Sequence, residues 1–247
     1  MKLQNKILVR FCWSWIALVC VGTIIHGIYR TWWIAEGVSG NLQPNLLNPN
    51  QVNDMGYIKH HLMSYMHLVT GIVLYILGPL QFVDRIRRKW PKVHKWSGYC
   101  FFTTIMVVGI TGILMGILFP VGGTSETSSS ILFSLVMIFC VLRSIAMILK
   151  RRVELHRQWM IRSYMISLGP ATMHALIPLF IQIGGKDIGE ALSLSLWIGF
   201  TIHLILAEVW IHNSRPPEKG QSAESKKQKA AVAILTPTSQ ERYEITL

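Results

Sequence analysis

Histidines inside apolar segments are the residues of this sequence best able to do chemistry. His26, His67, His174 and His203 fall in four separate apolar segments, each on a face with small residues at helical spacing, and these four faces could converge on one site. Polar groups in membrane-spanning helices face the interior of the bundle and mark functional sites. Two imidazoles on facing helices at similar depth can ligate a haem iron axially. The pattern predicts a haem b site with His67 and His174 as metal ligands, and His203 as the alternative partner.

The depths of these histidines favour the first pairing, while close packing is the competing interpretation. At about 1.5 Å rise per residue, His67 lies roughly 10 Å, His174 about 15 Å and His203 about 20 Å from the outer end of its helix. Small residues on the same faces leave room for a macrocycle, but they also let membrane helices pack closely. An imidazole on such a face can simply donate a hydrogen bond to a neighbouring helix. The sequence leaves both interpretations open.

A second group of charged and imidazole side chains lies toward the opposite ends of the predicted helices. His94, His156, Arg143 and Arg162 are candidate cofactor-binding residues there. An unpaired arginine inside a membrane segment costs roughly 2.5–3.5 kcal/mol. Glu208, interpreted as the only intramembrane acid, is therefore predicted to pair with Arg143 or Arg162. Alternatively, the arginines bind an anionic group such as a haem propionate or a lipid headgroup.

Soft metal ligands near the outer end of the second predicted helix suggest a copper site as a third possibility. His60, Met63 and His67 share one helical face, and thioether and imidazole ligands suit copper, although methionine is also an ordinary apolar filler. The four cysteines all lie in apolar segments without a CxxC pair, which argues against a disulfide framework or a zinc site. No hydrolase elbow, phosphate loop, HExxH or dinucleotide fingerprint occurs, so no catalytic residue is assigned.

The elements that must position these residues are membrane-spanning helices. Apolar residues make up 51% of the chain and charged residues only 15%, whereas soluble domains carry about 25% charged residues. The uncharged gaps are about 20 residues long, which is the length that spans a bilayer core. The sequence predicts an all-α bundle of six transmembrane helices, at about residues 7–29, 61–83, 96–119, 130–149, 159–183 and 190–212.

The placement of positive charge predicts the topology. Much of the net charge of +12 falls before the first predicted helix, between the second and third, between the fourth and fifth, and after the sixth. Positive loops stay cytosolic, so both termini are expected inside the cell, in the inner (plasma) membrane. These loops would contact anionic lipid headgroups, and nucleic acid is excluded as a partner because no soluble basic domain is present.

The end of the chain differs in composition from the rest. From residue 213 onward it is rich in Pro, Ser, Lys, Gln and Glu, and such a segment buries too little apolar surface to offset its ordering entropy. The predicted organisation is therefore a membrane domain over residues 1–213 and a disordered cytosolic tail over residues 214–247.

Three stretches together resemble an uncharacterised family of bacterial multi-pass membrane proteins, a predicted membrane domain of unknown function. They are HLVTGIVLYILGPLQF (67–82), VHKWSGY (93–99) and ELHRQWMIRSY (154–164), within a similarity that covers about residues 57–180. The resemblance implies a location and a fold, since the family has no established activity. The positions that it carries over by motif are His67, His94, Trp96, Gly98, His156, Arg157, Trp159 and Arg162.

The stretch at residues 94–98 (HKWSG) is also similar to the HRWxG opening of a helix in ferric reductases and two-haem b-type cytochromes. Those proteins place a second histidine about four turns later, where this sequence has Val107 or Val108. The expected function is a b-type haem membrane protein that transfers electrons to an unknown redox partner. The alternatives are a non-catalytic membrane scaffold and a small-molecule transporter, and the sequence does not decide whether the protein is an enzyme.

Overall fold

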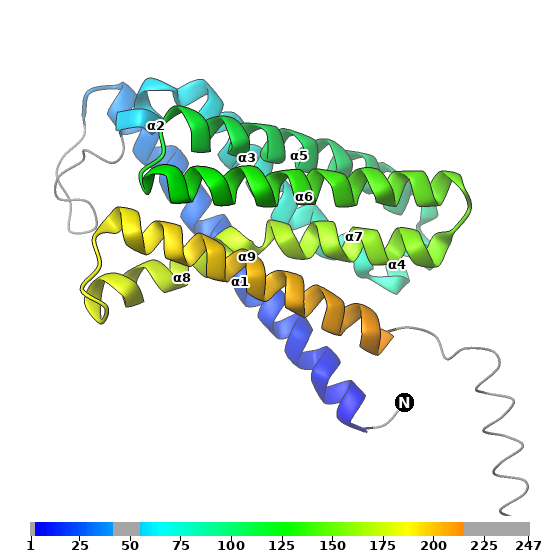
Figure 1. The fold of residues 1–247 in the computed structure, drawn as a ribbon. Coiled ribbons are helices and arrows are strands. Elements are labelled where there is room, and N and C mark those ends of the chain that lie inside the picture. Colours follow the sequence, from blue (N-terminus) through cyan, green and yellow to red (C-terminus); the bar gives the residue numbers. More distant parts are fainter. Residues whose placement is uncertain (1–2, 42–54, 215–247) are drawn as a thin grey trace, which may run out of the picture. The chain divides into compact units, whose positions relative to one another are not determined.

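The computed structural model describes residues 3–41 and 55–214, with side chains from residue 13 onward. The predicted tail lies almost entirely outside these described residues. All regular structure within them is helical, and the helices up to Trp210 belong to one compact unit, Met1–Trp210 (Figure 1). The helices are α1 Leu3–Val38, α2 Met55–Lys59, α3 His61–Phe82, α4 Asp84–Lys89, α5 Pro91–Leu118, α6 Gly123–Leu149, α7 Val153–Ser167, α8 Gly169–Gln182 and α9 Ile188–Ser214.

Six helical segments of the described chain are long and apolar enough to cross a membrane. Helices suit the hydrocarbon interior of a membrane because every backbone N–H and C=O can form a hydrogen bond within the helix itself. The six segments are Trp13–Val38, His61–Phe82, Pro91–Leu118, Gly123–Leu149, Val153–Gln182 and Ile188–Ser214. The predicted all-α, six-helix membrane fold is confirmed, and the protein contacts the lipid bilayer.

The fifth span is broken into α7 and α8 at Leu168, because Pro170 has no N–H to donate to the preceding turn. The N–H of Ala171 instead bonds the carbonyl of Leu168 at 3.1 Å. This leaves the carbonyl of Ser167 free to accept a 2.7 Å hydrogen bond from the Tyr75 hydroxyl on α3. A buried carbonyl left unpaired is costly, so Tyr75 stabilises the break and fixes the start of α8.

Two glycines permit close approaches that hold this region together. A Cβ on Gly78 of α3 would lie 2.0 Å from Cε2 of Tyr164, and a Cβ on Gly199 of α9 would lie 2.6 Å from the Gly169 carbonyl of α8. The Tyr164 ring is fully buried, and its hydroxyl lies 3.2 Å from Cys20 Sγ on α1. Helices α1, α3 and α7 therefore meet at Tyr164, while α8 and α9 touch backbone to backbone.

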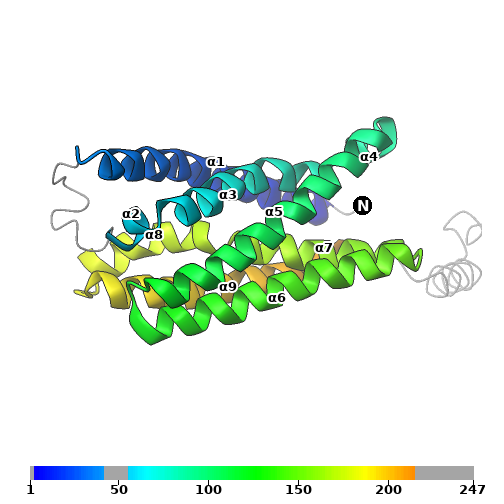
Figure 2. The same ribbon diagram turned by 90° about the horizontal axis from the view of Figure 1, so that it is seen from above.

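Connections of the same kind gather at the same end of this unit. Helix α4 and the α6–α7 turn lie at one end, and α2, the α5–α6 turn and the α8–α9 turn lie at the other (Figures 1 and 2). Helix α4 and the α6–α7 turn are the two strongly basic connections. Their shared end agrees with the alternation of charge in the sequence, and the assignment of that end to the cytosol stays a prediction.

Candidate functional site

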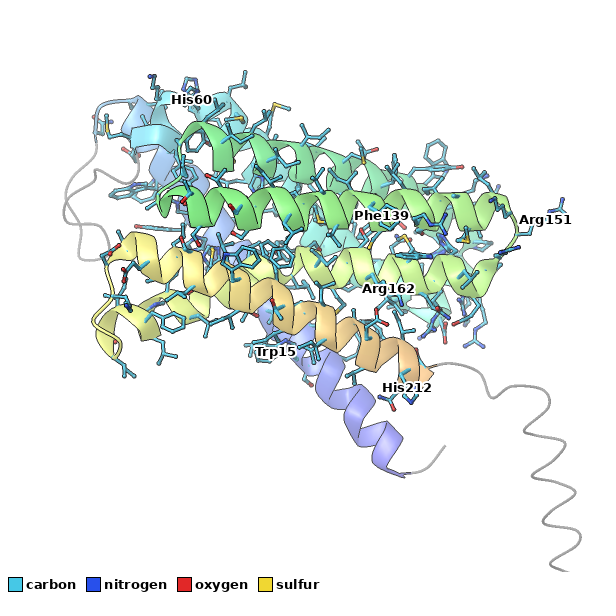
Figure 3. All side chains as sticks on the ribbon, viewed as in Figure 1. Trp15, His60, Phe139, Arg151, Arg162 and His212 are labelled. Carbon is cyan, nitrogen blue, oxygen red and sulfur yellow. The ribbon has the colours of Figure 1, made fainter. Side chains whose placement is uncertain are left out.

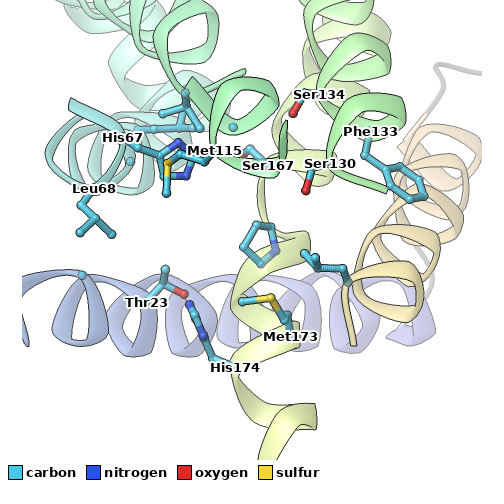
Figure 4. A pocket seen from close by; sticks show the side chains of 18 of the residues that line it. Thr23, His67, Leu68, Met115, Ser130, Phe133, Ser134, Ser167, Met173 and His174 are labelled. Atoms are coloured by element: carbon cyan, nitrogen blue, oxygen red, sulfur yellow. The ribbon is translucent and has the colours of Figure 1, made fainter. Parts of the chain in front are cut away.

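A cavity of about 200 Å³ lies among the helices of this unit and is lined by residues of α1, α2, α3, α5, α6, α7, α8 and α9 (Figure 4). Most of its wall is apolar, with side chains such as Ile72, Met115, Phe133 and Met173. A few polar side chains converge on it from different helices: Thr23, His26, Tyr57, His67, Glu126, Ser130, Ser134, Ser167 and His174. An apolar pocket with few convergent polar groups is the usual form of a small-molecule site.

His67 lines the cavity from α3, and one of its ring nitrogens contacts a side chain of α5. Its Nδ1 lies 2.9 Å from Oγ1 of Thr111 on α5, and the Thr111 hydroxyl donates to the Val107 carbonyl at 2.7 Å. A carbonyl can only accept, so a Thr111 hydroxyl that donates to Val107 accepts from His67, and this arrangement corresponds to the tautomer with the proton on Nδ1. The Nε2 of a neutral imidazole then keeps its lone pair, so His67 offers the cavity a hydrogen-bond acceptor or a metal ligand.

His174 lies across the cavity from His67 (Figure 4), and its ring packs against that of a third histidine. The rings of His174 on α8 and His26 on α1 have centroids 3.8 Å apart and an interplanar angle of 33°. The two predicted metal ligands therefore line one cavity, as their depths suggested. The sequence placed His26 on one of the four faces that could converge on one site, but it was not proposed as a ligand, because a helical face does not reveal which neighbouring helix it meets.

Glu126 corrects the prediction that Glu208 is the only intramembrane acid. The prediction began the fourth helix at residue 130, but α6 begins at Gly123, so Glu126 lies in its first turn and in the membrane span. Its side chain is buried, lines the cavity, and accepts a 2.6 Å hydrogen bond from the Gly122 N–H. A carboxylate is stabilised at a helix N-terminus, which explains how this wall tolerates an acid.

His203, the predicted alternative ligand, lies outside the cavity lining. It is fully buried on α9, and its Nδ1 donates to the Gly199 carbonyl at 2.8 Å. Its Nε2 has no hydrogen-bond partner among the described residues. The geometry thus associates His67 with His174 rather than with His203.

His94 and His156 belong to the other end of the bundle. His94 is in the first turns of α5, whereas His67 contacts Thr111 of the same helix, about 25 Å further along its axis at 1.5 Å per residue. The His156 ring on α7 contacts Ser144 on α6, with Nδ1 2.7 Å from its hydroxyl and 3.0 Å from its carbonyl oxygen. The predicted cofactor-binding residues therefore form separate groups.

Arg162 and Glu208 form the predicted intramembrane ion pair. Arg162 Nε and Nη2 donate to the two carboxylate oxygens of Glu208 at 2.6 and 2.9 Å, a bidentate arrangement. Arg143, the other predicted partner, instead lies over the Trp159 ring with its guanidinium carbon 5.7 Å from the ring centroid. The prediction of a pair with one of the two arginines is confirmed for Arg162, which is labelled in Figure 3.

The orientation of His67 fits the role of a metal ligand, but the volume of the cavity is too small for a whole haem. The Nδ1 bond of His67 is the kind that orients metal-ligating histidines. However, the volume of about 200 Å³ is below the range of about 300–1,000 Å³ for pockets that hold drug-sized ligands, and a haem is larger than those. In the described part of the chain, no group of three or more His, Cys, Asp or Glu side chains could hold a metal ion.

Comparison with known proteins gives one match. A family model described as "Predicted membrane protein (DUF2306)" matches residues 64–211, from α3 into the last turn of α9. The match includes His67, Glu126 and His174 but not His26. No curated protein and no solved structure matches the chain.

Proposed function

We propose that this chain, which belongs to the DUF2306 family of predicted membrane proteins, binds the hydroxyl-bearing headgroup of a membrane-soluble aromatic molecule, such as a phenol or a quinol, among its helices. The observation that carries the proposal is the imidazole of His67, which lines a mostly apolar cavity and whose Nδ1 contacts Thr111, so that Nε2 is the nitrogen left for a ligand. The description of the family names a location and no activity, so the ligand class is argued from the cavity alone.

The size of the cavity limits the ligand to one or two rings. An apolar cavity of about 150 Å³ binds benzene, and the cavity here has about 200 Å³. Gly71 adds to this space, because a Cβ built on it would meet no atom within 4 Å. If the ligand carries a long apolar tail, the tail must extend out of the bundle into the lipid, where apolar groups are solvated without a free-energy penalty.

The polar groups limit the chemistry of the ligand. His67 Nε2 accepts a hydrogen bond, so the ligand must supply an O–H or N–H there. His174 on the opposite side is an imidazole, which in its neutral form has one donor and one acceptor nitrogen. A quinol or a phenol with a second polar group meets both requirements with a planar apolar body between them.

Binding of a matched pair of probes tests the proposal. Full-length protein in detergent is titrated with 1-naphthol and with 1-methoxynaphthalene, which has the same rings but no O–H. Since a neutral hydrogen bond contributes about 0.5–1.5 kcal/mol, 1-naphthol should bind about 2- to 10-fold more tightly. His67→Leu should abolish that preference. His61→Leu, on the exposed start of the same helix, should retain it, and an unchanged preference in His67→Leu contradicts the proposal.

A b-type haem held by His67 and His174, with electron transfer as the function, is the second candidate. It is favoured by the orientation of His67 through Thr111, and it requires α1 and α8 to move apart to admit the macrocycle. Protein purified from haem-replete cells should then be coloured, with a Soret band that shifts on dithionite reduction and is lost in His67→Ala. Colourless protein that still binds 1-naphthol contradicts the haem candidate and leaves the first proposal standing.

A further inference from the structure

Among the described residues, one exposed arginine on α6 has no acidic partner. Arg143 is exposed, and its neighbours Phe139 and Leu142 are exposed apolar side chains, so this face of α6 meets lipid. Within the described residues, no carboxylate lies within ion-pair distance of Arg143. A charged side chain on such a face needs an anion or access to the membrane surface.

The surroundings of Arg143 carry one uncompensated positive charge. Its guanidinium carbon lies 5.7 Å from the centroid of Trp159, and that of Arg162 lies 4.8 Å from the same ring. Glu208 neutralises Arg162 through two hydrogen bonds. Two guanidinium groups and one carboxylate therefore leave a net charge of +1 beside an indole ring, and that charge belongs to Arg143.

The depth of Arg143 suits the phosphate layer of a bilayer. Helix α6 has 27 residues, which at 1.5 Å each is about 40 Å, against a hydrocarbon core of about 30 Å. About 5 Å of the helix would extend beyond the core at each end if the helix were centred. Arg143 precedes Leu149, the last residue of α6, by six residues or about 9 Å. Its attachment point is then about 4 Å inside the core boundary, within reach of a phosphate for a long side chain.

From these observations we infer that Arg143 and Trp159 form a binding site for a phosphate group, and that an anionic phospholipid of the surrounding leaflet supplies it. The guanidinium fork matches two phosphate oxygens. Trp159 holds the guanidinium by a cation–π contact and sits at the depth where indole rings prefer the membrane interface. The site is independent of the cavity around His67, which lies toward the opposite end of the bundle.

Lipid titrations of the full-length protein test this inference. In mixed micelles, phosphatidylglycerol should raise the Tm of the wild type more than phosphatidylcholine does, since only the anionic lipid gains from Arg143. Arg143→Gln should weaken phosphatidylglycerol binding about tenfold or more, because hydrogen bonds to charged groups are the strong ones. Arg143→Lys keeps the charge but loses the fork, so it should be intermediate.

Two controls distinguish the alternatives. Lys150→Gln removes one positive charge at the end of the same helix and should change the affinity for phosphatidylglycerol less than twofold. Inorganic phosphate at the same concentration should give no Tm shift; an equal shift would assign the site to free phosphate instead of lipid. Equal affinity of wild type and Arg143→Gln for phosphatidylglycerol, with both proteins folded in phosphatidylcholine, overturns the inference.

Discussion

The imidazole Nδ1 of His67 on α3 lies 2.9 Å from the hydroxyl oxygen of Thr111 on α5. This contact joins two helices that pack along much of their length, and it fixes which nitrogen of His67 faces the cavity. Gly112 lies next to this contact on α5, and a Cβ there would be in ordinary van der Waals contact with His67, 3.5 Å from its Cε1. The proposed ligand specificity depends on this orientation.

Thr111→Val should therefore weaken both binding and stability. Valine keeps the shape but removes the acceptor, so His67 loses its fixed tautomer, and we expect a loss of about 0.5–1.5 kcal/mol in stability. The preference for 1-naphthol over 1-methoxynaphthalene should shrink in the same variant. Thr103→Val is the control, since the Thr103 hydroxyl bonds only the Tyr99 carbonyl of its own helix. Equal behaviour of the two variants would argue against the role of Thr111.

The pair of Arg162 and Glu208 should appear as a coupling energy. Glu208→Gln leaves Arg162 without its counter-charge and should lower the Tm in detergent, and a second change, Arg162→Gln, should recover part of the loss. The expected coupling is about 0.5–3 kcal/mol. Arg143→Gln provides the comparison, because Arg143 contacts Trp159 rather than Glu208. Strict additivity of Glu208→Gln and Arg162→Gln would show that the pair contributes nothing.

Two glycines of α3 should respond in opposite ways to alanine. A Cβ on Gly78 would lie 2.0 Å from the buried Tyr164 ring, whereas a Cβ on Gly71 would meet no atom within 4 Å. Gly78→Ala should destabilise the protein by about 1–3 kcal/mol through overpacking. Gly71→Ala should be neutral or stabilising by up to about 1 kcal/mol from helix propensity. Thermal unfolding of both variants checks this, and a tolerated Gly78→Ala would contradict the α3–α7 packing.

Reporter fusions should reveal the orientation of the bundle. Fusions after Leu118 and Gly184, in the connections with little positive charge, are expected to report an external location. Fusions after Lys92 and Arg152, beside the basic connections, are expected to report the cytosol. If both basic sites report the outside, the predicted orientation is reversed, and if they disagree, the six-span arrangement itself is wrong.

The sequence predicted the number of membrane helices but not all of their ends. Apolar stretches of spanning length are local properties of a chain, so the six spans were visible. Helix α6 starts at Gly123 instead of residue 130 because the polar residues 124–130 continue the helix near its end. Because the predicted helix began too late, Glu126 was placed in a loop. Acidic residues favour the first turn of a helix, and this preference could have indicated the earlier start.

The contacts between side chains in the cavity could not be predicted from the sequence, for a different reason. Helical spacing placed His67 and His174 on interior faces at comparable depth, and both line the cavity. Which helices face one another depends on long-range packing, such as the Gly169–Gly199 contact. The His26–His174 ring contact and the His67–Thr111 hydrogen bond follow from that packing. No periodic pattern in the sequence encodes them.

The most direct test of the central claim is to fill the cavity without touching its polar groups. Gly71→Leu places a side chain into the open space of the lining, and Gly22→Leu adds the same side chain at an exposed position of α1, where a Cβ also meets no atom within 4 Å. Calorimetric titration of both folded variants with 1-naphthol measures the effect. The account predicts that Gly71→Leu weakens binding by about tenfold or more, the equivalent of about 1.4 kcal/mol, while Gly22→Leu binds as the wild type does. Equal affinities of the two variants would contradict it.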